Sequence, residues 1–179
     1  MVILGIDPGS RKAGYAVIKV VGRKVEYLAS GALRYDKTPE FLDRLGLIYQ
    51  SVRELCQKYS PDEVALESLI YVKSIPALSK LAQARGAMIA AMSETCLGKI
   101  YEYSPNLVKS SVTGHGHAAK EGVEKSLQMI FGSQLDFKTS DESDALAIAV
   151  CHFLSRDAKK LGGTTSGKRT LKSVFSGRA

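Results

Sequence analysis

The chain has 179 residues, of which 45% are hydrophobic and 24% charged, which suits one compact domain and excludes a wholly disordered chain. The formal net charge of +7 indicates a polyanionic partner such as a nucleic acid. No apolar run approaches the ~20 residues of a membrane helix, and the apolar start ends at Asp7 without a cleavage site, so we predict no membrane span and no signal peptide.

An antiparallel meander opens the predicted fold, since three short strand-like segments are joined by turns. Apolar residues at spacings of three and four then predict a helix that ends near Leu55, with Asp36 or Thr38 as its cap and Pro39 in its first turn. The predicted strands cover residues 2–6, 13–20, 24–34, 62–67 and 99–103, and the later helices cover 75–95, 105–112, 118–131 and 140–154. This order predicts an α/β fold, a mixed five-stranded sheet with helices on both faces.

The composition changes from Gly162 onward, where Gly, Ser, Thr, Lys and Arg dominate and no acid follows Asp157. We therefore expect one domain over residues 1–157 and a flexible basic tail over 158–179. The cysteines are odd in number and form no CxxC pair, which predicts reduced and mostly buried thiols in a cytoplasmic protein. They are Cys56, Cys96 and Cys151.

Four acids are predicted to stand where a strand ends or a helix begins. Asp7 and Glu67 end the first and fourth strands, and Asp141 and Asp144 open the last helix with the i, i+3 spacing of one helical face. Carboxylates that converge repel one another and stay ionised together only beside cations. Hard divalent ions with oxygen ligands suit such a site, and two ions about 4 Å apart can support phosphodiester hydrolysis.

Simpler interpretations of the same acids stay open on spacing alone. Asp141 suits a helix start through the helix dipole, and Glu142 has the spacing for a capping box with Thr139. A single aspartate after a strand, such as Asp7, is often a turn former. Glu67 favours the metal site, because burying a carboxylate at the end of a buried strand is costly unless a cation or hydrogen-bond donor compensates it.

Five segments, in this order and with fitting spacing, resemble the RuvC family of bacterial Holliday-junction resolvases. The resemblance covers about residues 2–155, and five motifs in order are far more specific than any one of them. The segments are Gly5-Ile6-Asp7-Pro8-Gly9 with Gly14-Tyr15, Ala65-Leu66-Glu67, Gln83-Ala84-Arg85-Gly86, Val108-Lys109 with the run from Gly114 to Lys120, and Asp141 with the run from Asp144 to Ala149.

The resemblance implies a ribonuclease H-like fold and a homodimer that nicks two strands of a four-way DNA junction. It implies that Asp7, Glu67, Asp141 and Asp144 are metal-binding catalytic acids for Mg²⁺, with Mn²⁺ as a substitute and two ions per site. A dimer is reasonable physically, because symmetric resolution needs two equivalent sites on a two-fold symmetric substrate. The resemblance also implies the RuvA–RuvB branch-migration complex as a partner.

One departure from the family concerns the position three residues after the second acid, where the family often has an aromatic residue that stacks on a base. Here that position is Ile70, and Tyr71 follows it. Three roles stay open: Tyr71 stacks on a base, Ile70 acts as an apolar wedge, or both residues pack within the protein.

The candidate DNA contacts are basic or lie in the glycine-rich segment. Lys109 and Lys120 match family positions near the scissile strand and are predicted to hold phosphates, while Lys73, Lys80 and Arg85 are candidates for the DNA face. In the glycine-rich segment, His115 and His117 are expected near DNA, although a short flexible connector is the rival interpretation. The HxH pair has no third zinc ligand nearby in sequence, so zinc is not predicted.

Three other functions fit the sequence less well than a junction-cutting nuclease. An ATPase of the actin and sugar-kinase type also opens with a strand, an aspartate and a glycine turn, but this chain lacks the length for a duplicated domain and has no second glycine-rich phosphate loop. A YqgF-type nuclease would share the acids but act on RNA, and the basic glycine-rich loop favours the junction enzyme over it. A non-catalytic junction-binding scaffold is disfavoured because all four acids are present.

Overall fold

The computed structural model describes residues 1–22, 24–69, 74–132 and 135–160. Five strands and five helices lie in these ranges. The strands are β1 (Val2–Asp7), β2 (Lys12–Val21), β3 (Lys24–Arg34), β4 (Glu63–Glu67) and β5 (Ile100–Tyr103). The helices are α1 (Phe41–Tyr59), α2 (Ile75–Cys96), α3 (Pro105–Thr113), α4 (Lys120–Phe131) and α5 (Ser140–Lys160).

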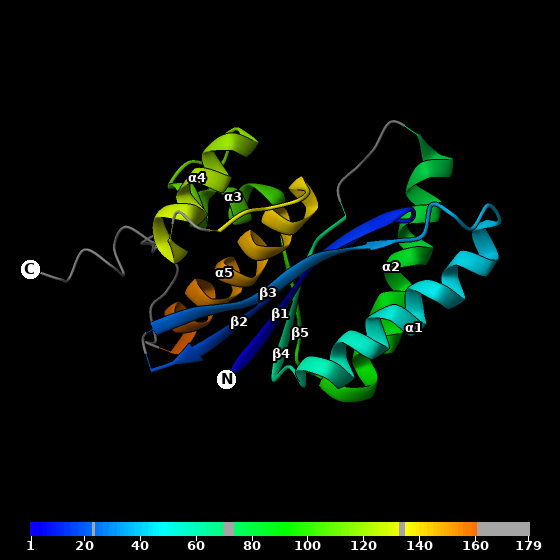
Figure 1. Ribbon diagram of the computed structural model, residues 1–179, viewed down its shortest axis with the longest axis horizontal. Coiled ribbons are helices and arrows are strands. Elements are labelled where there is room, and N and C mark those ends of the chain that lie inside the picture. Colours follow the sequence, from blue (N-terminus) through cyan, green and yellow to red (C-terminus); the bar gives the residue numbers. More distant parts are fainter. Residues whose placement is uncertain (23, 70–73, 133–134, 161–179) are drawn as a thin grey trace, which may run out of the picture.

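The strands form one mixed sheet in the order β3-β2-β1-β4-β5. The predicted meander accounts for the antiparallel part, in which β1 pairs with β2 and β2 with β3. The parallel part adds β4 beside β1 and β5 beside β4. The predicted five-stranded mixed sheet is therefore confirmed, and β1 lies at its centre (Figure 1).

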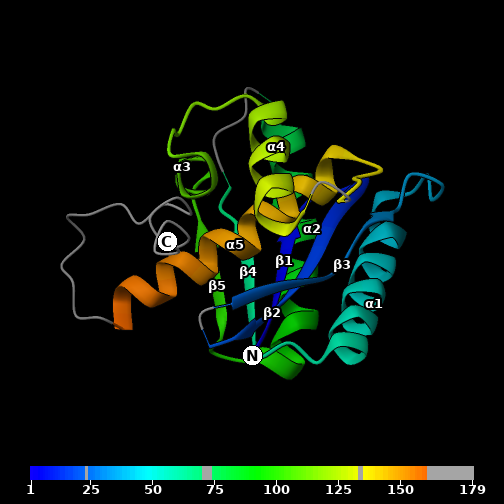
Figure 2. The same ribbon diagram turned by 60° about the vertical axis from the view of Figure 1, so that its left-hand side comes forward.

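Helices cover both faces of the sheet, as predicted (Figures 1 and 2). One core cluster joins Leu4, Ile6 and Leu66 of the sheet to residues of α1 and α2. The other joins Ile3 and Ala65 to residues of α3, α4 and α5. Alternate residues of β1 and β4 thus belong to opposite cores, because successive side chains of a strand point to opposite faces.

The start of α1 differs from the prediction. Its N-cap is Glu40, which makes no side-chain capping bond, so the predicted caps Asp36 and Thr38 were wrong and Pro39 precedes the helix. The reason is the buried Arg44, whose guanidinium donates to the carbonyl oxygens of Thr38 and Pro39 at 3.0 and 2.8 Å. These bonds from a side chain inside the helix fix the approach to α1 in place of a side-chain cap at its first residue.

The last helix also differs from the prediction, because α5 continues to Lys160 rather than ending near 154. Residues 158–160, assigned to the tail from composition, are therefore helical. The rest of the predicted basic tail, residues 161–179, lies outside the described residues. The three cysteines are buried and free of disulfides, as expected. No helix in the described ranges is both long and apolar enough to cross a membrane.

Candidate metal centre and active site

Two of the predicted acids end neighbouring parallel strands. Ile6 of β1 pairs with Leu66 of β4, so that Asp7 and Glu67 are the next residues of each strand. Because Ile6 and Leu66 belong to the core under α1 and α2, the alternation of strand side chains directs both carboxylates to the opposite face, which α5 covers. The carboxyl ends of parallel strands are where open α/β sheets commonly place their sites.

Glycines allow α5 to approach this face closely. A Cβ atom on Gly5 would stand 2.3 Å from the carbonyl oxygen of Ala145, and one on Gly14 would stand 1.9 Å from that of Asp141. Both distances are far below van der Waals contact, so only glycine fits at either position. The close approach brings the first turns of α5, with Asp141 and Asp144, beside the end of β1.

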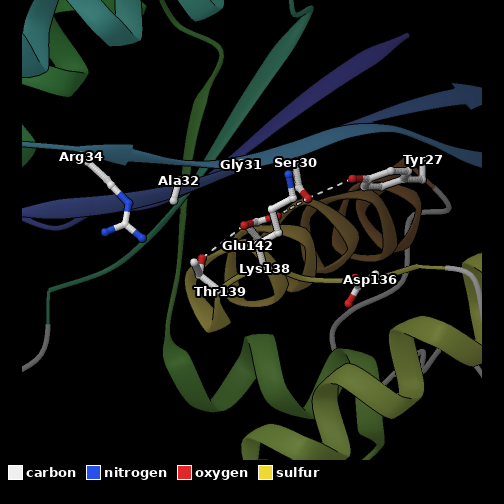
Figure 3. Close-up of a pocket in the computed structure, with 9 residues that line it drawn as sticks. All are labelled: Tyr27, Ser30, Gly31, Ala32, Arg34, Asp136, Lys138, Thr139 and Glu142. Carbon is white, nitrogen blue, oxygen red and sulfur yellow. Dashed lines mark hydrogen bonds between the residues drawn. The ribbon is translucent and has the colours of Figure 1, made fainter.

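The first turn of α5 is also tied to β3 by a partly buried hydrogen-bonded chain (Figure 3). Glu142 accepts from the Ser30 hydroxyl at 3.0 Å and from the Thr139 hydroxyl at 3.3 Å, and Ser30 in turn bonds Tyr27 at 2.9 Å. These residues line a pocket of about 370 Å³ between β3 and α5. Glu142 thus contacts Thr139 through its carboxylate and also through its backbone N–H, which donates to the Thr139 carbonyl oxygen at 3.1 Å, and its bond to Ser30 holds α5 against the sheet.

The pKa of Asp7 is raised by its surroundings in the site. Burial first, and then the charges of Asp144, Glu67 and Asp141, raise the pKa of Asp7 to about 7. Burial and the charge of Asp144 also raise the pKa of Glu67, against the opposing effect of Lys109 and Lys120. The carboxylates are therefore close enough to repel one another in a partly desolvated site.

Lysines compensate two of the four acids directly. The Lys120 ammonium lies 2.9 Å from Oδ2 of Asp144, and this hydrogen bond raises the pKa of Lys120. The Lys12 ammonium forms an ion pair with Oδ2 of Asp141. Within the part of the chain that the structure describes, Asp7 and Glu67 form no ion pair. Sequence reasoning missed Lys12, for which the only signal was its place just after the turn that follows Asp7.

The residues present fit divalent metal ions by their chemistry. Four carboxylates from three elements gather at one place, where burial and the charges of the other three acids raise the pKa of Asp7. Oxygen donors of this kind are the preferred ligands of Mg²⁺ and Mn²⁺. Among the described residues, however, no three acidic, histidine or cysteine side chains already stand in metal-holding positions.

Comparison with known proteins identifies the family. The family model described as crossover junction endodeoxyribonuclease RuvC matches residues 3–152. The chain belongs to the RuvC family. The predicted endodeoxyribonuclease is thereby confirmed.

RuvC proteins of known sequence and structure are similar over nearly the whole chain. Those of Trichlorobacter lovleyi and Natranaerobius thermophilus are 39% and 40% identical, over 91% and 85% of this chain and 90% and 94% of theirs. The Thermus thermophilus RuvC solved in complex with a Holliday junction substrate is 32% identical, with a TM-score of 0.80, over 89% of this chain and 96% of that chain. These likenesses confirm the predicted ribonuclease H-like fold.

The structure brings some of the candidate DNA contacts of this RuvC chain to the acids. Lys109 of α3 and Lys120 at the start of α4 both act electrostatically on Glu67. His115 and His117 are exposed in the loop between α3 and α4. The loop leaves α3 through Gly114, whose φ of 85° favours glycine.

The other candidates lie elsewhere. Ile70, Tyr71 and Lys73 fall outside the described residues. Lys80 is exposed on α2, with its ammonium 5.6 Å from the ring centre of Phe41. Arg85 is buried and lies 2.6 Å from the Glu102 carboxylate. The prediction of Arg85 on an exposed DNA face was therefore wrong, because its guanidinium is held between α2 and β5.

Proposed function

We propose that Asp7, Glu67, Asp141 and Asp144 form the catalytic metal centre with which this Holliday-junction-resolving endonuclease cuts DNA. The single observation that carries the proposal is the convergence of the four carboxylates, since Asp7 and Glu67 end paired strands and Gly14 lets the first turn of α5 approach them. Four carboxylates that repel one another are unfavourable in the metal-free protein, and bound cations would offset this repulsion.

The RuvC family is metal-dependent, and we propose Mg²⁺ as the ion, with Mn²⁺ as a substitute and two ions per site. Cations held by the four carboxylates would activate a water molecule and stabilise the leaving oxygen. Asp7, Glu67, Asp141 and Asp144 would hold the cations beside the scissile phosphate. The expected products carry a 5′-phosphate and a 3′-hydroxyl, which a ligase can rejoin.

We propose that the junction lies across the ends of α3 and α4, next to the acids. Lys109 and Lys120 would hold phosphates on either side of Glu67, and Lys120 would also stabilise charge on the reacting phosphate. His115 and His117 are exposed on the adjoining loop and would contact the same strand. We also propose Ile70, Tyr71 and Lys73 as DNA contacts, because they follow Glu67 within a few residues in the sequence.

The assembly is proposed from the symmetry of the substrate. A Thermus thermophilus relative was solved with a Holliday junction, which has two strands of equivalent geometry to cut. A homodimer supplies two equivalent sites for them. We further propose the RuvA–RuvB complex as a partner, a cytoplasmic location, and a basic tail that adds non-specific affinity for DNA.

The test compares a synthetic four-way junction with a linear duplex of matching sequence, with and without Mg²⁺. Paired symmetric nicks in the junction alone, and only with Mg²⁺, are the expected result. Asp7→Asn should abolish cutting but keep junction binding. Asp62→Asn is a matched control, because Asp62 is exposed and its side chain accepts from the Val2 amide of the described structure, away from the acids. Cutting by the Asp7→Asn variant at the wild-type rate would overturn the proposed metal centre.

A further inference from the structure

We infer that Lys12 is a positioning residue that holds Asp141 in the metal-free protein and has to release it before a divalent cation binds. This inference rests on the proposed metal centre, because it concerns the access of a cation to one of the four acids. It adds to that centre the first residue of β2, which the family motifs quoted above do not include.

The backbone of the turn determines where the Lys12 side chain points. The turn after Asp7 is closed so tightly that a Cβ atom on Gly9 would stand 1.9 Å from the Lys12 carbonyl oxygen. Lys12 then begins β2 and pairs with Arg34 of β3. Its side chain points to the same face of the strand as that of Ala16, four residues on. That face is the one α5 covers, since Ala16 belongs to the core beneath α5.

The contact itself covers the carboxylate oxygen that a cation would need. The Lys12 ammonium forms an ion pair with Oδ2 of Asp141, with 32% and 25% of the two side chains exposed. This oxygen is inaccessible to solvent and accepts no hydrogen bond of good geometry from the described residues. The ammonium is therefore its direct counter-ion, and a cation can reach the same oxygen only after the ammonium has moved away.

The second lysine at the site differs from Lys12 in its freedom to move. Lys120, which pairs with Asp144, is 59% exposed at the start of α4. Lys12 is half as exposed and extends from the strand adjacent to Asp7. Its displacement therefore takes an ammonium out of a partly buried ion pair. Breaking this ion pair costs free energy, and that cost lowers the affinity of the site for a divalent cation.

The direction of the effect follows from this competition. Removing the Lys12 charge leaves Asp141 free to bind a cation and makes the site more negative, so affinity for a divalent cation should rise. We expect Lys12→Met to bind Mn²⁺ about five- to tenfold more tightly than the wild type, the effect of one partly buried ion pair. Lys12→Arg should stay near the wild type, because the guanidinium keeps the charge and can form the same pair.

The experiment titrates the full chain with Mn²⁺ alone, without DNA, and follows free Mn²⁺ by electron paramagnetic resonance. Lys19→Met is the matched control, since Lys19 lies on the same strand, is exposed, and removes the same charge far from the acids. Tighter binding by Lys12→Met, with Lys12→Arg and Lys19→Met near the wild type, is the expected pattern. Equal or weaker binding by Lys12→Met would overturn the inference about Lys12.

A further arm separates this inference from the proposed metal centre. Asp7→Asn should lose Mn²⁺ binding, and a variant that keeps it would overturn the centre and, with it, the role of Lys12. The second readout is thermal unfolding with EDTA and with Mn²⁺. The increase in Tm on adding Mn²⁺ should be larger for Lys12→Met than for the wild type, because ligand stabilisation follows affinity. Should Lys12→Met fold poorly, Lys12→Gln, which keeps a long polar side chain, is held to the same expectation.

Discussion

Gly14 of β2 lies so close to α5 that a Cβ atom there would stand 1.9 Å from the carbonyl oxygen of Asp141 and 2.9 Å from its Cβ. Strand β2 pairs residue by residue with β1, and Gly14 is the partner of Asp7. One glycine thus sets the separation between the acid at the end of β1 and the two acids of α5. The position of the proposed metal centre therefore depends on position 14 being a glycine, which has no Cβ atom.

Gly14→Ala is expected to displace the first turn of α5. Overpacking of this kind destabilises a protein by roughly 1–3 kcal/mol, and the displaced acids should lower Mn²⁺ affinity at least about tenfold, because metal ligands must be held within a few tenths of an ångström. Urea unfolding and a Mn²⁺ titration measure the two effects.

The control for this variant is Gly46→Ala, since a Cβ atom on Gly46 of α1 would meet nothing within 4 Å. Alanine favours the helix over glycine by about 1 kcal/mol, so this variant should match or exceed the wild-type stability and bind Mn²⁺ normally. If Gly14→Ala binds Mn²⁺ with wild-type affinity, the prediction is wrong, because the shift of α5 then leaves its acids in place.

The raised pKa of Asp7 predicts how stability depends on pH in the absence of metal. The pKa rises from 3.8 to about 7 on folding, so between these values the folded state binds the proton more tightly than the unfolded state. Stability should therefore fall as pH rises from about 4 to 7, by up to about 4 kcal/mol, and the loss should persist above pH 7.

Asp7→Asn removes this titration. In EDTA at pH 8 the variant should be more stable than the wild type, and the difference should shrink towards pH 4, as measured by urea unfolding across the pH range. A variant that is less stable than the wild type at pH 8 would contradict the raised pKa. The result does not depend on catalysis.

Lys109 and Lys120 are expected to differ in what they do for DNA. Replacing either with alanine should reduce the slope of log affinity against log salt by about 1, the loss of one phosphate contact. Lys120→Ala should also slow cutting by more than it weakens binding, because Lys120 pairs with Asp144 and acts on Asp7. Junction binding at several salt concentrations and single-turnover cutting measure these effects, with Lys19→Ala as the control. A salt slope unchanged from the wild type in Lys109→Ala and Lys120→Ala would remove both from the phosphate contacts.

A buried polar network that includes Glu63, at the start of β4, is expected to contribute to stability alone. His152 of α5 bonds the Tyr103 hydroxyl at 2.7 Å and Glu63 at 2.8 Å, and Arg156 also pairs with Glu63 at 2.8 Å. Glu63→Ala leaves the two basic groups without this acid and should cost about 3 kcal/mol in unfolding free energy.

Mn²⁺ affinity should stay unchanged in Glu63→Ala, since Glu63 begins the strand that Glu67 ends. Glu54→Ala, which alters an exposed acid of α1, should change stability by less than about 0.5 kcal/mol. Loss of Mn²⁺ binding in the folded Glu63→Ala protein would show that the network also supports the metal centre.

The sequence by itself determined the elements and which end of each one carries an acid. Strand alternation and helical spacing are local patterns, so Asp7, Glu67, Asp141 and Asp144 could be assigned to element ends before any contact was known. Local signals failed at the start of α1, where Arg44 holds the backbone from within the helix. They also failed for Arg85, whose charge suggested a DNA contact and whose side chain is buried against Glu102.

Only the tertiary structure decided which charges meet. The pairs Lys12 with Asp141 and Lys120 with Asp144, like the bond between His152 and Glu63, 89 positions apart, join residues that no local pattern relates. They form because α5 packs on the two glycines of β1 and β2, an approach that depends on the whole sheet being assembled. The sequence could supply the acids of the site, whereas their lysine counter-ions and the raised pKa values of Asp7 and Glu67 follow from packing.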